Sequence, residues 1–171
     1  MKLTKLFLVL ASFSSLLVAT GGVALADNPG KVQVTANVVG NCIVTSSGNI
    51  TFVDYNPLSP DPLDATADVS IKCTVNQIPL IALDYGAHTG SGSYNHMIGS
   101  KPTDVLDYQI LQPTGSGSAS KSTNQWNGKT LTGTAATNLT AVKYTMYGEI
   151  YTGQNVPVGT YTDTVTVTVN L

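Results

Sequence analysis

The chain has 171 residues, of which 42% are apolar, 7% aromatic and 11% charged, and its formal net charge is −2. Its eight lysines are spread along the chain and form no basic patch, which disfavours a nucleic-acid partner. Its apolar content is normal and its net charge is low, which disfavours intrinsic disorder. There is no arginine and one glutamate, whereas Thr, Gly, Ser and Val are abundant. This composition favours strands and turns over helices, and the length suits one domain.

The first 26 residues predict a secretory signal peptide. Lys2 and Lys5 precede an apolar run, and Ala24-Leu25-Ala26 forms a small-x-small site with cleavage between Ala26 and Asp27. The alternative is a membrane anchor, but polar residues and glycines interrupt the run before the roughly 20 apolar residues that a span needs. Removal of the two lysines changes the net charge from −2 to −4. We therefore expect an exported mature protein without stable membrane insertion.

Two cysteines, Cys42 and Cys73, follow the predicted signal peptide. In an oxidising compartment an even pair predicts a disulfide. The closed loop of about 32 residues would contribute roughly 3–4 kcal/mol in the chain-entropy model. A reactive thiol or a metal site is the alternative, but neither cysteine has a CxxC partner or a nearby histidine. Export therefore favours the disulfide.

Alternation of apolar and polar residues predicts several short strands. It is clearest in residues 164–171, where Val165, Val167, Val169 and Leu171 alternate with threonines and an asparagine. Asn127-Gly128 is a dipeptide typical of hairpins. These features predict an all-β sandwich of immunoglobulin-like type, with a closed barrel as the alternative. The other predicted strands are residues 32–38, 69–74, 79–83, 105–111 and 142–150.

The two ends of the mature chain carry complementary features. We expect no later segment to pair with the strand that ends at Leu171. Residues 27–38 form an extended segment with Val32, Val34, Ala36 and Val38 on one face. A terminal strand can be donated to a neighbour, and a sandwich with an open edge can accept it. From the pattern alone, however, an ordinary first strand within its own sheet is the favoured interpretation.

The mature chain resembles the spore coat protein U domain family, the pilin fold of archaic chaperone–usher pili. The most specific matches are residues 62–74, which read Pro-Leu-Asp-Ala-Thr-Ala-Asp-Val-Ser-Ile-Lys-Cys-Thr, and residues 159–169, which read Gly-Thr-Tyr-Thr-Asp-Thr-Val-Thr-Val-Thr-Val. Family members usually carry Phe-Gly-x-Tyr near position 52, where this chain has Phe52-Val53-Asp54-Tyr55. Weaker matches lie at residues 40–42, 50–55, 106–110 and 147–150.

This resemblance implies an incomplete immunoglobulin-like sandwich that lacks its final strand and is completed by donor-strand exchange. It implies that residues 39–171 form the pilin domain and that residues 27–38 hold the donor strand, which reverses the preference above. The donor side chains would be those of Val32, Val34, Ala36 and Val38. The strand carrying Val165, Val167, Val169 and Leu171 would border the groove.

The same resemblance implies a structural subunit of an extracellular pilus or surface coat that supports adhesion and biofilm formation. The implied partners are a periplasmic chaperone, an outer-membrane usher and other pilin subunits joined head to tail. The implied location is the cell surface, reached through the periplasm. The alternative is a self-contained secreted β-sandwich binding module, for example for carbohydrate, and an enzyme is the least favoured reading.

No catalytic constellation is present in the sequence, so we expect no enzyme and no cofactor. His88 and His96 flank a Gly/Ser loop without metal-ligand spacing, so we expect solvated loop residues. The three aspartates between positions 61 and 68 are unlike a calcium loop, and we expect them to solvate a sheet edge. We expect Trp126, beside the hairpin-type dipeptide, to pack in the protein, with stacking on a sugar as the alternative.

Overall fold

The computed structural model describes residues 30–88, 94–116 and 120–171. The predicted signal peptide and its cleavage position between Ala26 and Asp27 lie outside the described residues. The chain divides into two units, Met1–Asn37 and Val38–Leu171, and each is described by itself. In the described ranges the secondary structure consists of strands, and no helix there is long and apolar enough to cross a membrane.

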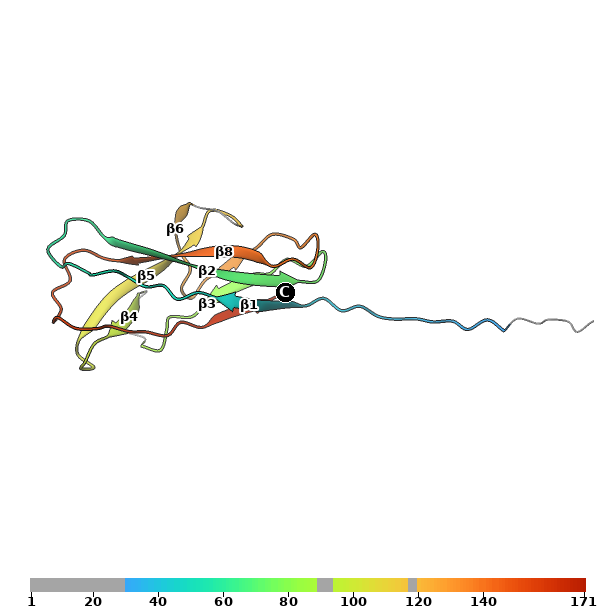
Figure 1. Ribbon diagram of the computed structural model, residues 1–171, viewed down its shortest axis with the longest axis horizontal. Helices are drawn as coiled ribbons and strands as arrows, with labels where there is room; N and C mark the ends of the chain where they lie inside the picture. Colours follow the sequence, from blue (N-terminus) through green and yellow to red (C-terminus); the bar gives the residue numbers. More distant parts are fainter. Residues whose placement is uncertain (1–29, 89–93, 117–119) are drawn as a thin grey trace, which may run out of the picture. The chain divides into compact units, whose positions relative to one another are not determined.

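The unit Val38–Leu171 is built from two antiparallel sheets (Figure 1). The first has the order β1-β2-β8-β5-β4, with β6 also pairing with β5, and the second has the order β7-β3-β9. The prediction of an all-β sandwich is confirmed, and two separate sheets take the place of the alternative closed barrel. The strands are β1 (Cys42–Ser47), β2 (Leu63–Cys73), β3 (Leu80–Leu83), β4 (Asn95–Ile98), β5 (Val105–Pro113), β6 (Lys121–Gln125), β7 (Thr130–Thr132), β8 (Val142–Ile150) and β9 (Val167–Asn170).

Five of the predicted strands correspond to β2, β3, β5, β8 and the shorter β9. In β8 the side chains of Tyr144, Met146 and Ile150 are buried on one face, as a period of two requires. The sequence pattern did not indicate β1, β4, β6 and β7. These strands have three to six residues, and β6 reads Lys-Ser-Thr-Asn-Gln, so they show too little apolar alternation to be detected.

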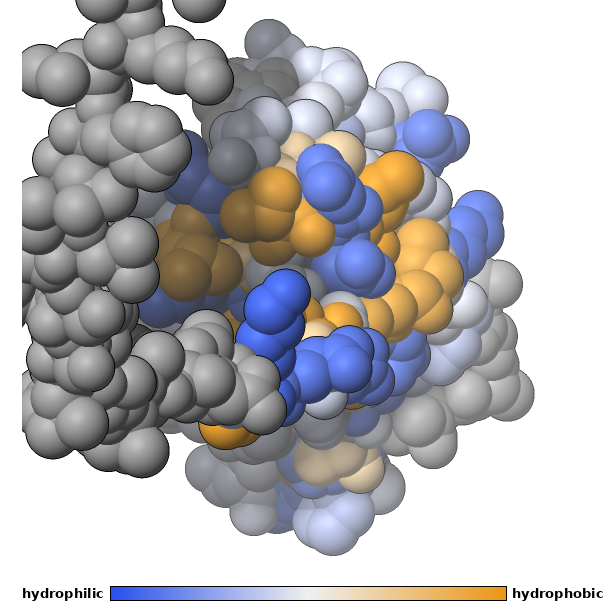
Figure 2. Space-filling model, turned by 90° about the vertical axis from the view of Figure 1, so that its right-hand side faces the viewer, coloured by the Kyte–Doolittle hydropathy of each residue, from blue (hydrophilic) through white to orange (hydrophobic). Residues whose placement is uncertain are grey.

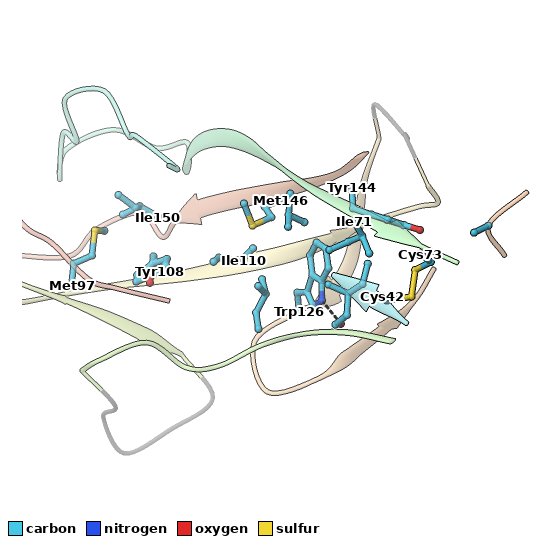
Figure 3. Packing of buried hydrophobic residues seen from close by; sticks show 14 of the residues in the cluster. Cys42, Ile71, Cys73, Met97, Tyr108, Ile110, Trp126, Tyr144, Met146 and Ile150 are labelled. Atoms are coloured by element: carbon cyan, nitrogen blue, oxygen red, sulfur yellow. Dashed lines mark hydrogen bonds between the residues drawn. A yellow bond between two sulfur atoms is a disulfide. The ribbon is translucent and has the colours of Figure 1, made fainter. Parts of the chain in front are cut away.

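Trp126 lies at the centre of the core between the sheets (Figure 3). Its side chain is fully buried, and its indole Nε1–H donates a hydrogen bond of 2.9 Å to the backbone carbonyl of Ile81 in β3. The expectation that Trp126 packs in the protein is confirmed. Stacking of this ring on a sugar is excluded because no part of the indole is exposed.

The predicted hairpin at Asn127-Gly128 is wrong, because this dipeptide carries the chain from β6 in the first sheet to β7 in the second. The Asn127 Oδ1 atom accepts from the Ile110 N–H of β5 at 2.8 Å. The Gly128 N–H donates to the Leu83 carbonyl of β3 at 2.8 Å. Gly128 has a φ of 64°, a conformation that glycine adopts without steric cost. The dipeptide therefore joins the two sheets instead of reversing the chain within one.

Cys42 and Cys73 form a disulfide, as predicted. They occupy directly opposite positions on β1 and β2, and their Cα atoms are 4.1 Å apart. The disulfide therefore ties the edge strand of the first sheet to its neighbour at one end of the core (Figure 3).

Candidate functional site

The unit Val38–Leu171 contains a groove of about 330 Å³. One wall is the segment that follows β1, and the other is the segment that leads into β9. Since β1 is an edge strand of the first sheet and β9 an edge strand of the second, the groove lies where these two sheet edges part. Figure 3 labels four of the residues that line the groove, and all four lie to the left of Trp126 and of the disulfide: Met97, Tyr108, Ile110 and Met146. The apolar and aromatic lining residues are Ile50, Phe52, Leu83, Met97, Tyr108, Ile110, Met146, Tyr161, Val165 and Val167.

The outer edge of β9 is free along the groove. In the part of the chain that the structure describes, β9 pairs with β3 on one side and with no strand on the other. The Asp84 N–H donates to the Thr166 carbonyl at 3.1 Å, so Asp84 and Thr166 form a hydrogen-bonded pair of this antiparallel ladder. Residues opposite each other alternate between hydrogen-bonded and non-hydrogen-bonded pairs. The N–H and C=O groups of Val167 and Val169 therefore point to the free edge.

The side chains of the same segment alternate as predicted. Val165, Val167 and Val169 are half-buried and pack against the core, while the threonines between them are exposed. An additional strand at this edge would therefore find free backbone groups and an apolar groove side by side. This combination is what strand addition uses for affinity and for specificity.

The strand at this edge is shorter than predicted, because Val165 and Leu171 lie outside β9. Before β9 the chain leaves its ladder with β3: the Thr166 N–H donates to the Asp84 carboxylate at 2.9 Å, and Thr162 pairs with Ile98 at the end of β4. Val165 still lines the groove, whereas Val169 and Leu171 do not. Leu171 is 52% exposed, beyond the last residue paired with β3.

The opposite wall depends on a glycine that the sequence analysis did not single out. A Cβ atom on Gly148 of β8 would lie 2.7 Å from both Ile50 Cγ2 and Phe52 Cζ. Glycine therefore allows this wall to lie directly on the first sheet. The Phe52 ring also meets Tyr108 edge to face, with 6.4 Å between the ring centroids. A glycine within an alternating strand was the one available signal of such a close approach.

Val53 stands where family members usually have glycine, and the local backbone accommodates it. In the described ranges Asn76 is the one non-glycine residue with positive φ, so Val53 has an ordinary backbone conformation. The nearby Tyr55 hydroxyl donates to the Tyr151 carbonyl and accepts from the Gln154 N–H, both at 2.9 Å. These bonds hold the segment in place without a glycine.

One acidic side chain belongs to the groove. The Asp163 side chain is only 2% exposed. Its Oδ2 atom accepts from the Tyr108 hydroxyl at 2.7 Å, and its Oδ1 atom accepts from the Ala87 N–H at 3.0 Å and lies 3.1 Å from His88 Nδ1. Burial and the adjacent Asp163 carboxylate raise the pKa of Tyr108 above its ordinary value. Tyr108 therefore remains a hydrogen-bond donor at physiological pH.

The histidines only partly match their prediction. His88 is partly exposed in the segment after β3, as expected. The expectation is wrong for His96, which lies in β4 with a side chain 14% exposed and hydrogen-bonds to Asp107. No group of three or more metal-ligating side chains occurs among the residues whose positions are described.

Asp64 is exposed and lies in the part of β2 that pairs with β8 on one side and is not paired with β1 on the other, as expected for a sheet edge. Asp61 is exposed and precedes β2. The expectation is wrong for Asp68, whose carbonyl accepts from the Gly48 N–H on the side of β1.

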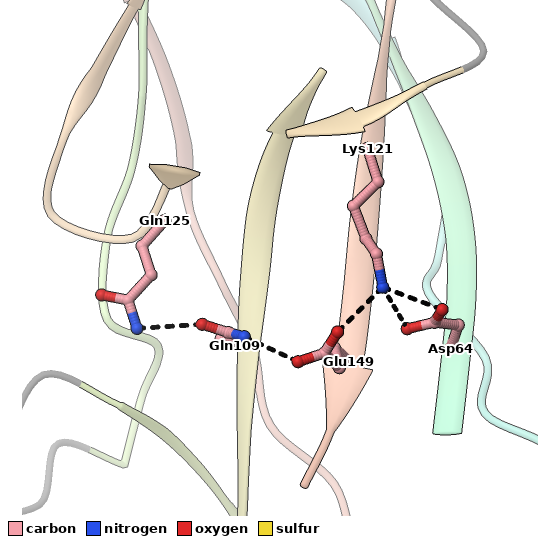
Figure 4. A network of polar contacts seen from close by, with 5 residues as sticks. All are labelled: Asp64, Gln109, Lys121, Gln125 and Glu149. Carbon is pink, nitrogen blue, oxygen red and sulfur yellow. Dashed lines mark hydrogen bonds and ion pairs between the residues drawn. The ribbon is translucent and has the colours of Figure 1, made fainter. Parts of the chain in front are cut away.

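Lys121 Nζ from β6 bridges the Asp64 carboxylate at 2.9 Å and the Glu149 carboxylate at 2.8 Å (Figure 4). Glu149 also accepts from the Gln109 amide at 2.8 Å. Burial acts to raise the pKa of Glu149, but the bonds from Lys121 and Gln109 outweigh it and lower the pKa. This network links side chains of β2, β5, β6 and β8 across the first sheet, so we interpret it as structural.

Exposed apolar side chains also occur outside the groove, among them Val75, Ile78 and Leu139. Figure 2 shows one face of the molecule, on which such side chains lie among hydrophilic ones. Scattered exposed apolar residues are normal for a protein surface. We assign no site to them.

The predicted donor residues are uncovered in the single chain. The described part of the first unit, residues 30–37, contains no strand. Val32 and Val34 are each 88% exposed, Ala36 is exposed, and Val38, at the start of the second unit, is 87% exposed. The described part of the alternating segment therefore forms no strand within the first unit.

These features define an immunoglobulin-like sandwich with an open apolar groove along a free sheet edge. The model of the Spore Coat Protein U domain matches residues 29–168, and the chain belongs to this family. It is similar to Protein U of Myxococcus xanthus, with 29% identity over 167 residues that cover 90% of each chain.

One solved structure supports the fold. It is the chaperone–tip adhesion subunit pre-assembly complex CsuC–CsuE from the archaic chaperone–usher Csu pili of Acinetobacter baumannii. One of its chains aligns with a TM-score of 0.55 and 23% identity, over 78% of this chain. This chain spans 40% of the length of that solved chain.

Proposed function

We propose that the protein is a structural subunit of an extracellular chaperone–usher pilus or surface coat. Residues 31–38 of one copy occupy the groove of the next and complete its sandwich. The observation that carries this proposal is the apolar groove beside the free edge of β9. The uncovered alternating segment at the other end of the chain supports it.

The chemistry of donor and acceptor is complementary. In an added strand, Val32, Val34, Ala36 and Val38 turn into the groove, and the polar residues between them face solvent. Each buried valine contributes about 1.5–3 kcal/mol. A shift of one residue would place Gln33, Thr35 and Asn37 against the apolar lining, so the alternation also defines the register.

Assembly follows from the position of the two features in one chain. A donor at one end and an acceptor groove elsewhere make a head-to-tail contact that does not close, and such contacts produce filaments. In this scheme residues 1–26 direct export, residues 27–38 carry the donor, and residues 39–171 form the pilin domain.

The family and the solved relative, a chaperone–subunit complex, suggest the partners. A periplasmic chaperone covers the groove before assembly, and an outer-membrane usher joins the subunits. The product at the cell surface supports adhesion and biofilm formation. It is a structural protein without catalytic activity.

The experiment uses the exported protein carrying Val34→Asp, which disables its own donor and leaves the groove intact. Synthetic peptides of residues 31–38 are added, and binding is measured by native mass spectrometry and thermal unfolding. The natural peptide should bind one to one and raise Tm. A Thr35→Asp peptide, changed on the outward face, should bind in the same way, and a Val34→Asp peptide should not. Equal behaviour of the two altered peptides would contradict the assignment, and a stable monomer indifferent to all three would favour a self-contained binding module.

A further inference from the structure

One wall of the groove is held by few backbone contacts. Residues 161–166 lie outside the strands. Among the described residues, the backbone bonds of this wall are at its two ends, where Thr162 pairs with Ile98 and Thr166 with Asp84. Between these points the side chain of Asp163 turns inward and is 2% exposed. The wall is therefore held midway by a side chain.

The Asp163 carboxylate ties this wall to both sheets. Tyr108, its partner at 2.7 Å, belongs to β5 of the first sheet, and Ala87, its partner at 3.0 Å, follows β3 of the second. Gly86 makes room for the carboxylate: it has a φ of +85°, and a Cβ atom there would lie 2.0 Å from Asp163 Oδ2. The backbone at Gly86 and Ala87 therefore makes room for the Asp163 carboxylate and donates a hydrogen bond to it.

An empty apolar groove in water has a tendency to close. Movement of Tyr161 and Val165 toward Ile50 and Phe52 would remove apolar surface from water, which is favourable. Such a movement would displace Asp163 from its position between Tyr108 and Ala87, which its two hydrogen bonds fix. A buried carboxylate that loses its hydrogen bonds without regaining water is strongly destabilised. The bonds of Asp163 therefore oppose closure of the wall.

We propose that Asp163 is a positioning residue that holds the acceptor groove open for an incoming β-strand. The inference rests on the proposed function and adds a specific consequence to it. A preformed groove reduces the ordering that binding requires. Once a strand fills the groove, the strand itself keeps the walls apart. Loss of Asp163 should therefore slow association much more than it speeds dissociation.

The test compares variants in the exported Val34→Asp protein, whose own donor is disabled. Asp163→Asn keeps an acceptor for Ala87 but places an NH₂ group or a weaker acceptor against the Tyr108 hydroxyl. Tyr108→Phe removes the same bond from the other side and retains the ring. The control is Asp68→Asn, which removes a carboxylate bonded to Lys143 and Thr145 and outside the groove lining.

Association and dissociation rates of the peptide of residues 31–38 are measured by surface plasmon resonance, and folding is checked by circular dichroism. Asp163→Asn and Tyr108→Phe should each slow association about tenfold with less than a threefold change in dissociation, and Asp68→Asn should leave both rates within twofold. If the parent binds the peptide and both groove variants associate at the parental rate, the positioning role is wrong and the proposed function stands. If the parent itself does not bind, the proposed function fails. Should Asp163→Asn not fold, Tyr108→Phe alone decides the outcome.

Discussion

Single polar side chains hold much of this sandwich together. Trp126 and Asn127 bond across the two sheets, and Asp163 does so at the groove. Lys121 reaches from β6 to carboxylates on β2 and β8. Each of these contacts joins a different pair or group of strands. Their effects should accordingly be separable by single substitutions.

Glu149 gives a prediction for pH dependence. Its pKa in the folded protein lies below its ordinary value of 4.5, so its stabilising contribution is present above that value and is lost as the pH falls through the folded pKa. Glu149→Gln should lower the free energy of unfolding by about 1 kcal/mol at pH 7. The difference from the natural protein should shrink at acid pH. Urea unfolding between pH 3 and pH 7 measures it.

The matched control for this measurement is Asp61→Asn, at an exposed position where the carboxylate makes no ion pair among the described residues. It should follow the natural protein at every pH. A constant offset between Glu149→Gln and the natural protein across the whole range would contradict the role assigned to the carboxylate.

At the scale of elements, β1 depends on its covalent link to β2. It is an edge strand, and the groove wall at residues 47–52 continues from it. A double substitution, Cys42→Ser with Cys73→Ser, should lower the free energy of unfolding by about 3 kcal/mol, since the unfolded chain regains the freedom of a loop of about 32 residues. Urea unfolding with and without a reductant measures this effect. The reduced natural protein should match the double variant, and a further loss in the variant on adding reductant would show that the disulfide is not the cause.

The ends of the elements follow from backbone hydrogen bonding. β9 begins at Val167 because the Thr166 N–H is taken by the Asp84 side chain and not by a ladder carbonyl. This departure carries the chain from the second sheet toward β4 of the first, and the groove lies along that path. Within β9, the backbone groups of Val167 and Val169 face outward because these residues occupy non-hydrogen-bonded positions of the ladder with β3.

For the whole molecule, the proposed assembly makes fibre formation depend on the donor face. Val34→Asp in the full chain should leave export to the periplasm intact and abolish fibres, because a carboxylate cannot enter the apolar groove without a large desolvation cost. Electron microscopy and surface fractionation measure this outcome. Thr35→Asp, one residue along and on the outward face, should assemble normally. Fibres of normal length from the Val34→Asp variant would rule out the assigned donor.

Local features of the sequence were sufficient for β2, β3, β5 and β8 and for the disulfide. Alternation in β2, β5 and β8 follows from the pleat, in which side chains two residues apart share a face. The pairing of Cys42 with Cys73 follows from their number and from the expected export. The family resemblance indicated which terminal segments matter, and its donor assignment remains a prediction.

Tertiary structure alone decided how these strands are shared between two sheets and where the sheets part. Asn127-Gly128 changes sheet and His96 lies in a strand, although the neighbouring sequence shows neither fact. The glycine at position 148 signalled a close approach, but the sequence did not show that Ile50 and Phe52 are the residues that make it. Asp163 meets Tyr108 across 55 positions of chain. Such contacts depend on the packing of segments that are distant in sequence, whereas alternation depends only on residues two positions apart. For that reason the strands could be predicted locally and the groove could not.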